Sequence, residues 1–422
     1  MVSVRVKVAL LIITAFFILG VLSPILSEEG IIEKWNKIES WSLNPKNVPP
    51  NWYARLIKLP PSEWLRGENG TYKYLFTYKE APQDIVVITN STKRIRVEII
   101  DPENRRYVLF DGYPYKMVRI RLQKFRIMEI LREKCNDTVP MGNLVLKNTL
   151  NIIFSKPKKN CLDDPEFLHG EYKIKIEGDS NAKVFIAGKG FGILGTDIYG
   201  RDIWAGFVWG TKDTLVIGII GAFISTVIGA LVGTLGGSGK KTGKIVDGIV
   251  LLLSYLPLLP FASVFFLLIS PFSEDWALGL SASPLKISIA LGIMTMGFVA
   301  RDVKSIVSAE LKRDYVEVSL GMGGSYLFII KKHVSKVLIP YVVYRFSVMV
   351  PFIIAILTLL GFFNITAGLN WGTIMGLTVL EHVEYSLSWW LVLPVGVGLG
   401  LLGMAFVIIA QEAEERFKSP SE

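Results

Sequence analysis

The sequence contains little of what most enzymes and small secreted domains depend on. It has two cysteines and three histidines in 422 residues, so it cannot form a dense disulfide framework or a cysteine-based zinc cluster, and no histidine spacing indicates a metal site. Charged residues make up 20% of the chain, below the roughly 25% of soluble domains. No serine lies in a nucleophile elbow. We therefore predict no catalytic residues, no metal and no cofactor.

What the sequence has instead is long blocks of apolar residues. Hydrophobic residues make up 51% of the chain, and the mean hydropathy is +0.42. An apolar block of about 20 residues has the length of a helix that crosses a bilayer. We expect six such spans, at 8–26, 213–236, 245–270, 285–300, 338–361 and 388–410. The first has a basic start like a signal peptide, but signal cores typically have 7–15 residues, so a retained span is favoured.

The short loops between these blocks differ in charge, and this difference predicts the orientation. Three lysines lie between the second and third blocks: Lys240, Lys241 and Lys244. Lys and Arg recur throughout 301–336, whereas 271–284 and 362–387 contain acidic residues but no Lys or Arg. Positive charge in short loops marks the cytoplasmic face. We therefore expect a multi-pass protein of the cell membrane with both termini in the cytoplasm.

In this orientation residues 28–205 lie outside the cytoplasm. They include 29 of the 46 Lys and Arg residues, which fits because long loops translocate largely regardless of charge. Alternation of apolar and polar residues in 171–177, 94–100 and 118–122 predicts half-buried strands, and a helix is expected near 125–134. A β-rich extracytoplasmic domain is therefore predicted.

The expected fold class is an all-α polytopic membrane domain of about six helices, with the β-rich domain inserted between the first two. The boundaries are 1–27 for the N-terminal helix, 28–190 for the outer domain and 191–422 for the membrane core. Both cysteines, Cys135 and Cys161, lie in the outer domain and are either paired or two free thiols; the sequence leaves both open.

The basic residues do not indicate a nucleic-acid partner. The formal net charge of +9 is divided between loops around apolar blocks instead of forming one surface stripe. Asp247 and Arg345 lie near the ends of expected spans, where anchoring at the membrane interface is predicted.

Only three glutamines occur, which is typical of thermophile proteins and favours a thermophilic or archaeal source.

Small residues recur every fourth position along the second span. They are Gly221, Ser225, Gly229 and Gly233. Such spacing places them on one helical face and allows a second helix to approach closely in lipid. The face packs either against another helix of the same chain or against a partner membrane subunit. In the third span, Pro257 and Pro260 are expected to produce a kink.

The longest cytoplasmic piece, 301–336, is a candidate docking element. Glycines interrupt the helical pattern of Asp314–Ser325 and allow a sharp turn between two short helices. The chain has no visible energy source of its own, so a partner that docks at this turn would supply one. The alternative is an amphipathic helix that lies on the membrane.

Two motifs resemble those of one family. Glu317 and Gly323 match the E-A-A-x-x-x-G loop of binding-protein-dependent ABC importers, although Val318 and Ser319 replace the two alanines. Flanking residues are similar to the version in dipeptide and oligopeptide permeases: Asp314, Tyr315, Ser325 and His333. The segment before the second span is similar to the G-T-D-x-x-G-R-D segment of the C-type permease: Gly195, Thr196, Asp197, Gly200, Arg201 and Asp202.

The resemblance covers 191–422 and implies a permease subunit that imports peptides, with oligosaccharides or nickel as other substrates of related systems. It implies a second homologous permease, two ATP-binding subunits that dock at the coupling loop, and an extracytoplasmic solute-binding protein. By the same resemblance, Glu317 contacts the ATPase and Gly323 shapes the turn. The outer domain is not a usual feature of the family. A function of another class, a self-standing channel or a membrane-anchored sensor with an external ligand-binding domain, is the alternative.

Overall fold

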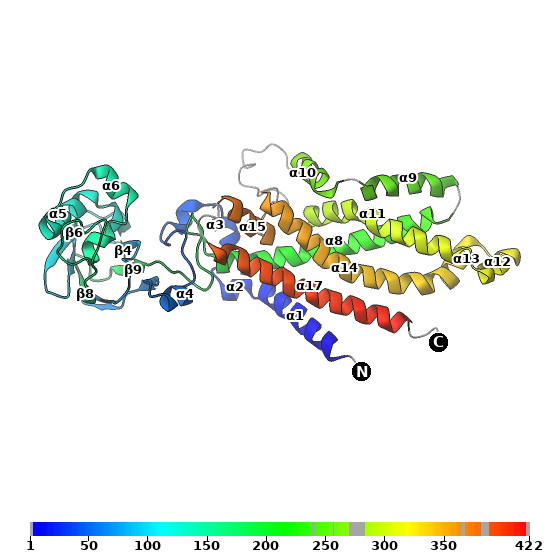
Figure 1. Cartoon of the computed structure of the whole chain (residues 1–422), viewed down its shortest axis with the longest axis horizontal. Helices are drawn as coiled ribbons and strands as arrows, with labels where there is room; N and C mark the ends of the chain where they lie inside the picture. Colours follow the sequence, from blue (N-terminus) through cyan, green and yellow to red (C-terminus); the bar gives the residue numbers. More distant parts are fainter. Residues whose placement is uncertain are drawn as a thin grey trace. The chain divides into compact units, whose positions relative to one another are not determined.

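The computed structural model describes residues 3–238, 241–255, 257–269, 283–363, 368–380 and 388–418. The chain divides into two compact units, a β-rich unit of Lys37–Trp204 and a helical unit of Met1–Asn36 with Ala205–Glu422 (Figure 1). Lys240 and the acidic residues of 271–284 and 362–387, which contributed to the expected orientation, lie outside the described residues.

The β-rich unit contains two antiparallel sheets. The first has the order β1 (Glu63–Trp64), β9 (Lys183–Ala187), β4 (Asp84–Ile88) and β7 (Met117–Arg119). The second has the order β2 (Gly67–Glu68), β3 (Thr71–Phe76), β8 (Gly170–Glu177), β5 (Ile95–Ile100) and β6 (Arg106–Gly112). The alternation of 171–177 corresponds to β8, along which buried and more exposed residues alternate. This strand pairs with β3 on one side and with β5 on the other.

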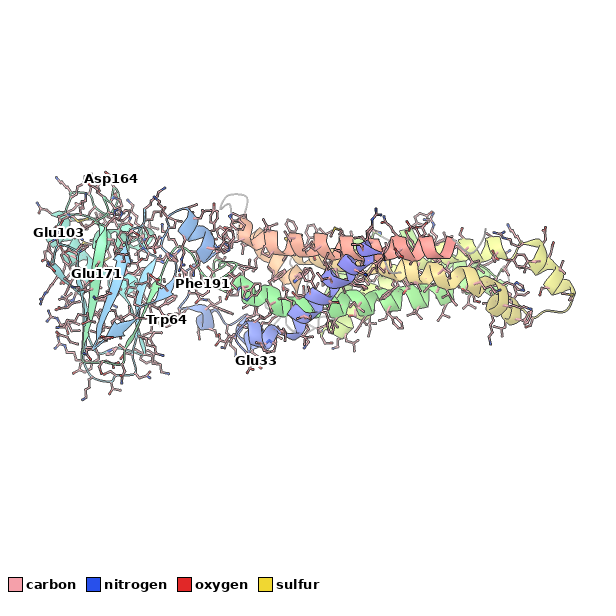
Figure 2. The ribbon with its side chains drawn as sticks, turned by 90° about the horizontal axis from the view of Figure 1, so that it is seen from below. Glu33, Trp64, Glu103, Asp164, Glu171 and Phe191 are labelled. Carbon is pink, nitrogen blue, oxygen red and sulfur yellow. A yellow bond between two sulfur atoms is a disulfide. The ribbon has the colours of Figure 1, made fainter. Side chains whose placement is uncertain are left out.

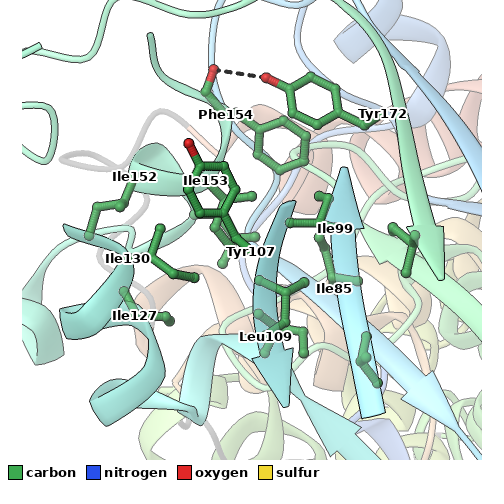
Figure 3. Close-up of a cluster of buried hydrophobic side chains, with 14 of the residues drawn as sticks. Ile85, Ile99, Tyr107, Leu109, Ile127, Ile130, Ile152, Ile153, Phe154 and Tyr172 are labelled. Carbon is green, nitrogen blue, oxygen red and sulfur yellow. Dashed lines mark hydrogen bonds between the residues drawn. The ribbon is translucent and has the colours of Figure 1, made fainter. Parts of the chain in front are cut away.

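The two sheets and the helices of this unit share one hydrophobic core. Ile85 comes from the first sheet, Ile99 from the second, Ile127 from α5 (Lys124–Cys135) and Phe154 from α7 (Leu150–Phe154) (Figure 3). The helix expected near 125–134 is α5. The remaining helices are η1 (Ile38–Trp41), α4 (Asn51–Leu56), η2 (Ile120–Leu122) and α6 (Met141–Leu146).

One expected strand, 118–122, is only partly formed. Strand β7 ends at Arg119, and the 3-10 turn η2 follows it. The buried carboxylate of Asp84 accepts hydrogen bonds from the Arg119 Nε and from the Arg121 backbone N–H, both at 2.8 Å. A backbone N–H that donates to a side chain is not available to a sheet neighbour, so the strand ends here.

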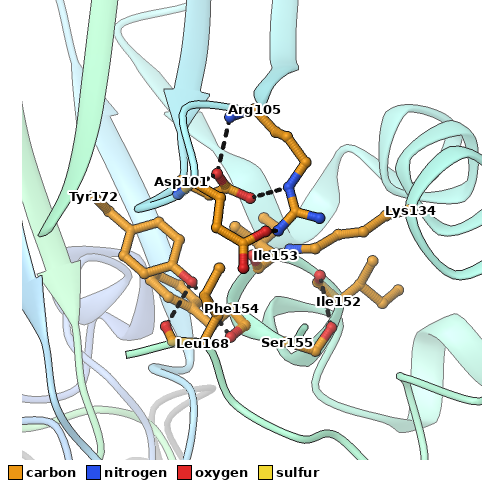
Figure 4. Close-up of polar contacts among 10 residues, drawn as sticks. Asp101, Arg105, Lys134, Ile152, Ile153, Phe154, Ser155, Leu168 and Tyr172 are labelled. Carbon is orange, nitrogen blue, oxygen red and sulfur yellow. Dashed lines mark hydrogen bonds and ion pairs between the residues drawn. The ribbon is translucent and has the colours of Figure 1, made fainter. Parts of the chain in front are cut away.

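A disulfide joins Cys135, the last residue of α5, to Cys161, with the two Cα atoms 6.1 Å apart. Close by, Lys134 is buried, and its Nζ donates to the Ile153 carbonyl at 2.8 Å. Asp101 accepts from Arg105, as Figure 4 shows. Burial lowers the pKa of Lys134 to about 8.

The helical unit has five single helices, among the described residues, that are long and apolar enough to cross a membrane: Val4–Val21, Ile203–Gly236, Pro284–Glu310, Tyr326–Phe362 and Trp389–Glu415. They belong to α1 (Val4–Val21), α8 (Ile203–Gly236), α11 (Pro284–Glu310), α13 (Tyr326–Ile329) with the π-helical turn η4 (Ile330–Val334) and α14 (Ser335–Phe362), and α17 (Trp389–Lys418). Shorter helices are α2 (Ser23–Leu26), α3 (Ile31–Lys34), α12 (Asp314–Gly321) and α15 (Trp371–Leu380).

The third expected span, 245–270, is not one helix. It consists of α9 (Lys241–Tyr255) and α10 (Leu258–Ile269), which have 15 and 12 residues. Pro257 directly precedes α10, and Pro260 lies in its first turn, where the missing N–H of proline has no helical acceptor to lose. The prolines therefore divide the segment more completely than the expected kink.

The small-residue face of α8 packs within the chain. A Cβ added to Gly229 would lie 2.7 Å from the Cβ of Val299 of α11, and one added to Gly233 would lie 2.5 Å from the Ala300 carbonyl. Ser225 accepts a 3.1 Å hydrogen bond from Thr295. Of the two alternatives for this face, the structure therefore shows contact with α11.

The first and last helices of the helical unit contact each other. Helices α1 and α17 pack side by side, and the Ser3 hydroxyl donates to Glu412 at 2.9 Å. Within this unit, the start of α1, the end of α17 and helix α12 lie toward one end, while α3 and α15 lie toward the other (Figure 1).

Candidate coupling site

The coupling segment is a compact helical turn between two long helices. Helix α11 continues to Glu310, so residues 301–310 of the expected 301–336 loop are helical, and α14 begins at Ser335. The turn proper runs through α12 and α13, which agrees with the expected pair of short helices. The segment between the two long helices is thus shorter and more helical than the expected 301–336 loop.

Two glycines shape the turn for different reasons. Gly323 has φ of +86°, a left-handed conformation that side chains rarely adopt, although a Cβ there would meet nothing within 4 Å. At Gly324 a Cβ would lie 2.6 Å from the Ser319 carbonyl, which accepts the Gly324 N–H at 2.9 Å. Ser325 then caps α13 by accepting from the Phe328 N–H at 3.3 Å. The sequence motif includes all three residues, but only Gly323 and Ser325 were predicted as site residues.

A buried carboxylate connects the turn to α11. Glu310 is the last residue of that helix and is 6% exposed. It accepts a hydrogen bond from the Tyr315 hydroxyl and lies 3.4 Å from the Arg313 Nε. The Tyr315 ring lies 5.1 Å from the His333 ring, so these two predicted residues come together. Glu310 itself was not predicted, because a glutamate in a charged segment gives no sign of burial.

The outer side of the turn is exposed and partly apolar. Val318 is 60% exposed, and Met322 and Leu327 are each 79% exposed. The predicted residues Asp314 and Glu317 are exposed on α12 as well. Exposed large apolar side chains are typical of a surface that binds a protein, and here acidic side chains lie beside them.

Further hydrogen bonds and ion pairs connect the turn and its flanking helices. The Tyr326 hydroxyl of α13 donates to the Thr234 carbonyl of α8 at 3.1 Å. Between α11 and α14, Asp302 accepts from the Tyr341 hydroxyl at 2.8 Å and lies 3.3 Å from the Arg345 guanidinium. Arg345 and Asp247, both predicted to anchor the chain at the membrane interface, thus also form ion pairs with α11. Asp247 pairs with Lys304 of that helix.

The segment before α8 is a closed loop built around Asp197. This side chain is fully buried and accepts from the backbone N–H groups of Tyr199 at 2.9 Å and of Arg201 at 2.8 Å, and from the Arg201 guanidinium. Burial raises the pKa of Asp197, and the Arg201 guanidinium opposes that rise. Asp202 accepts from the Trp204 N–H at 2.9 Å and so caps the first turn of α8.

The other members of this motif hold the loop in place. Thr196 donates to the Pro45 carbonyl at 2.9 Å, and Asn44 donates to the Gly200 carbonyl at 2.9 Å. Gly195 and Gly200 have φ of +79° and +85°. The structure therefore gives the six residues of this motif a role in positioning the start of α8.

The long apolar helices define the class, an integral membrane protein, and an exposed helical turn connects two of them. Residues 216–418 match the family described as binding-protein-dependent transport system inner membrane component. The match covers just under half of the chain, so this part of the helical unit is similar to the membrane components of such transport systems.

The relatives named by sequence similarity are peptide permeases. The chain is 28% identical over 210 residues to the oligopeptide transport system permease protein OppC of Haemophilus influenzae, covering 49% of this chain and 63% of that protein. It is 30% identical over 142 residues to the dipeptide transport system permease protein DppC of Lactococcus lactis, covering 33% of this chain and 38% of that protein. The chain thus spans less than two thirds of these relatives.

Proposed function

We propose that this chain is a permease, one transmembrane subunit of a peptide importer, and that an ATP-binding subunit docks on the turn around Gly323. The observation that carries the proposal is the exposed apolar surface of Val318, Met322 and Leu327 on a turn that hydrogen bonds hold in one shape. A rigid turn with apolar anchors transmits force from a partner better than a free loop. Peptides are proposed as substrate because the relatives are named as peptide permeases.

The docking turn also determines the proposed orientation. A partner that uses ATP is cytoplasmic, so the turn lies on the cytoplasmic side together with the start of α1 and the end of α17. The β-rich unit, placed in sequence between α1 and α8, is then extracytoplasmic, which suits its disulfide. Helices α9 and α10 together make the remaining crossing of a six-span topology.

The contacts of the turn suggest how movement reaches the membrane. Closure of the ATP-binding subunits would displace α12, and Glu310 would carry this displacement to α11 through its bond with Tyr315. Tyr326 would carry it to α8 through the Thr234 carbonyl. An alternation between inward-open and outward-open states, driven by a two-state partner, follows the general scheme of switching transitions.

The proposed assembly contains a second homologous permease, two ATP-binding subunits and an extracytoplasmic solute-binding protein. In it Glu317 makes a polar contact with the ATP-binding subunit, since its carboxylate is exposed on α12. A self-standing channel or sensor has no need of such a docking turn, and this turn favours the importer.

Copurification tests the proposal. The tagged chain is extracted gently from its native membrane, and the accompanying proteins are identified by mass spectrometry. We expect a stoichiometric second permease and ATP-binding subunits, and their loss from the preparation when Gly323→Val distorts the turn but leaves membrane insertion intact. A solitary chain that is stable without any ATP-binding subunit would contradict the proposal.

A further inference from the structure

The β-rich unit contains a cleft lined by cations. Two adjoining hollows, of about 320 Å³ and about 350 Å³, share Lys46, Gln83 and Arg121 in their walls. Together they have the size of a site for a small ligand. The cations that line them are Lys46, Arg119, Arg121, Lys124, Lys147 and Lys189. Asp84 is the single acidic residue in the two linings.

Half of these cations already have carboxylate partners. Asp84 pairs with Arg119, and Lys147 and Lys189 pair with Asp163 and Glu80. Within the fully described unit Lys37–Trp204, no ion pair involves the remaining three, Lys46, Arg121 and Lys124. The cleft therefore has an excess of positive charge that its own walls do not neutralise.

Hydrogen bonds to the fold anchor the backbones of two of these cations, Lys46 and Arg121. Gln83 donates to the Lys46 carbonyl at 2.9 Å and accepts from its N–H at 3.0 Å, which holds the Lys46 backbone in the cleft wall. The Arg121 N–H donates to Asp84 at 2.8 Å, so its guanidinium projects from an anchored backbone. Burial lowers the pKa of Lys124, and the positive charge of Arg121 adds to this effect.

Exposed apolar side chains accompany the cations. Leu122 and Val145 line the first hollow and are 64% and 59% exposed, and Leu146 lines the second. The acidic residues at the surface of this unit, such as Glu103, Asp164 and Glu171 (Figure 2), line neither hollow. An anion with an apolar part complements such a surface, since a guanidinium and an ammonium bind a carboxylate while the leucines cover a hydrocarbon chain.

We infer that this cleft binds the carboxylate end of a short peptide with an apolar last residue. Arg121 and Lys46 hold the carboxylate, and Leu122 and Val145 contact the side chain of the last residue. The choice of a peptide rests on the proposed function, whereas the carboxylate and the apolar contact rest on the cleft itself. The β-rich unit then captures peptides on the side from which the permease imports them.

Isothermal titration of the full chain in nanodiscs tests the inference. The probes are N-acetyl-Ala-Leu-Leu with a free carboxylate and the same peptide as its C-terminal amide. We expect the acid to bind at least about tenfold more tightly than the amide, because hydrogen bonds to a charged group are lost in the amide. Equal binding of acid and amide, or no binding of the acid at millimolar concentration, would overturn the inference.

A matched pair of variants separates the site from general charge. Arg121→Gln keeps the backbone hydrogen bond to Asp84, so the fold is retained. We expect this variant to bind the peptide acid at least about tenfold more weakly. Lys46→Gln provides a second variant with an effect in the same direction. Arg66→Gln removes the same charge from an exposed residue outside the cleft and should leave affinity unchanged. Equal losses in Arg121→Gln and Arg66→Gln would refute the site. ATP and partner subunits are absent, so this failure would leave the import proposal untouched.

Discussion

At the scale of single residues, substitutions of Gly323 and Gly324 in the docking turn should have different effects on transport. Gly324→Ala places a Cβ 2.6 Å from the Ser319 carbonyl, so the turn must open, and we expect transport to fall at least about tenfold. Gly323→Ala meets no atom but costs about 1–2 kcal/mol at φ of +86°, so a partial loss is expected. Uptake of labelled peptide in membrane vesicles measures both.

The chain offers controls for this pair. Gly321→Ala adds a methyl group in the same turn with nothing within 4 Å and with no left-handed backbone, so transport should remain normal. Gly323→Asn should retain more activity than Gly323→Ala, since asparagine tolerates the left-handed region. Normal transport by Gly324→Ala would show that the turn's shape is not needed.

The buried Lys134 should make the stability of the β-rich unit depend on pH. Its pKa in the folded protein is about 8, below the usual 10.5, so between these values the unfolded chain holds more protons than the folded one. Stability of the β-rich unit should therefore rise with pH across this window, by about 2 kcal/mol from about pH 7 to about pH 10. Calorimetry of the full chain measures it against Lys134→Met, which lacks the titrating group. Parallel pH profiles of the two proteins would contradict the prediction.

At the scale of elements, the disulfide is expected to stabilise the β-rich unit. It ties the end of α5 to Cys161 across 26 residues, and a loop of this length corresponds to about 3 kcal/mol. Cys135→Ser, Cys161→Ser and the double variant should therefore lower the free energy of unfolding by similar amounts, because each removes the same bond. Additive losses in the double variant, or no loss at all, would argue against the bond.

The contact between α8 and α11 leads to another prediction. Gly229→Val requires the helices to separate, since a Cβ at this position already lies 2.7 Å from Val299. We expect a loss of about 1–3 kcal/mol, seen as a lower melting temperature in detergent. Gly400→Ala in α17 is the control, because a Cβ there has no neighbour within 4 Å. If both variants melted alike, the close approach would have no energetic role.

The comparison of sequence and structure shows which elements a pattern can predict. Alternation in 171–177 predicts β8 because one face of that strand is buried, but it does not indicate that β8 lies between β3 and β5. Helical interruption at glycine predicts the turn at Gly323. Glycine is needed at position 324 because the Ser319 carbonyl lies close to it, and Glu310 is buried because the Tyr315 hydroxyl donates to it. Neither contact produces a periodic pattern in the sequence.

The small-residue face of α8 illustrates the same limit. A stripe of glycine and serine every fourth residue predicts that a helix packs there, but a helix of this chain and a helix of a partner would require the same stripe. The structure places α11 on it. Similarly, Pro257 and Pro260 indicate a break in the third span, but whether they bend one helix or separate two depends on contacts along the whole segment.

At the scale of the whole molecule, the proposed function requires the helical unit to span the membrane and the turn around Gly323 to face the cytoplasm. The start of α1, the end of α17 and the docking turn lie toward one end of the helical unit, as an importer driven from the cytoplasm requires. Residues 216–418 match a family of transport components, whereas the partners and the substrate follow from the proposed function.

Crosslinking from the turn identifies the protein that contacts it. A photoreactive residue replaces Met322, which is 79% exposed at the turn, and in a control it replaces Leu11, which is 69% exposed on α1. After illumination of native membranes, we expect an adduct with an ATP-binding subunit from position 322 and none from position 11. An absence of this adduct from position 322, or the same adduct from both positions, would contradict the claim that an ATP-binding subunit docks at the turn.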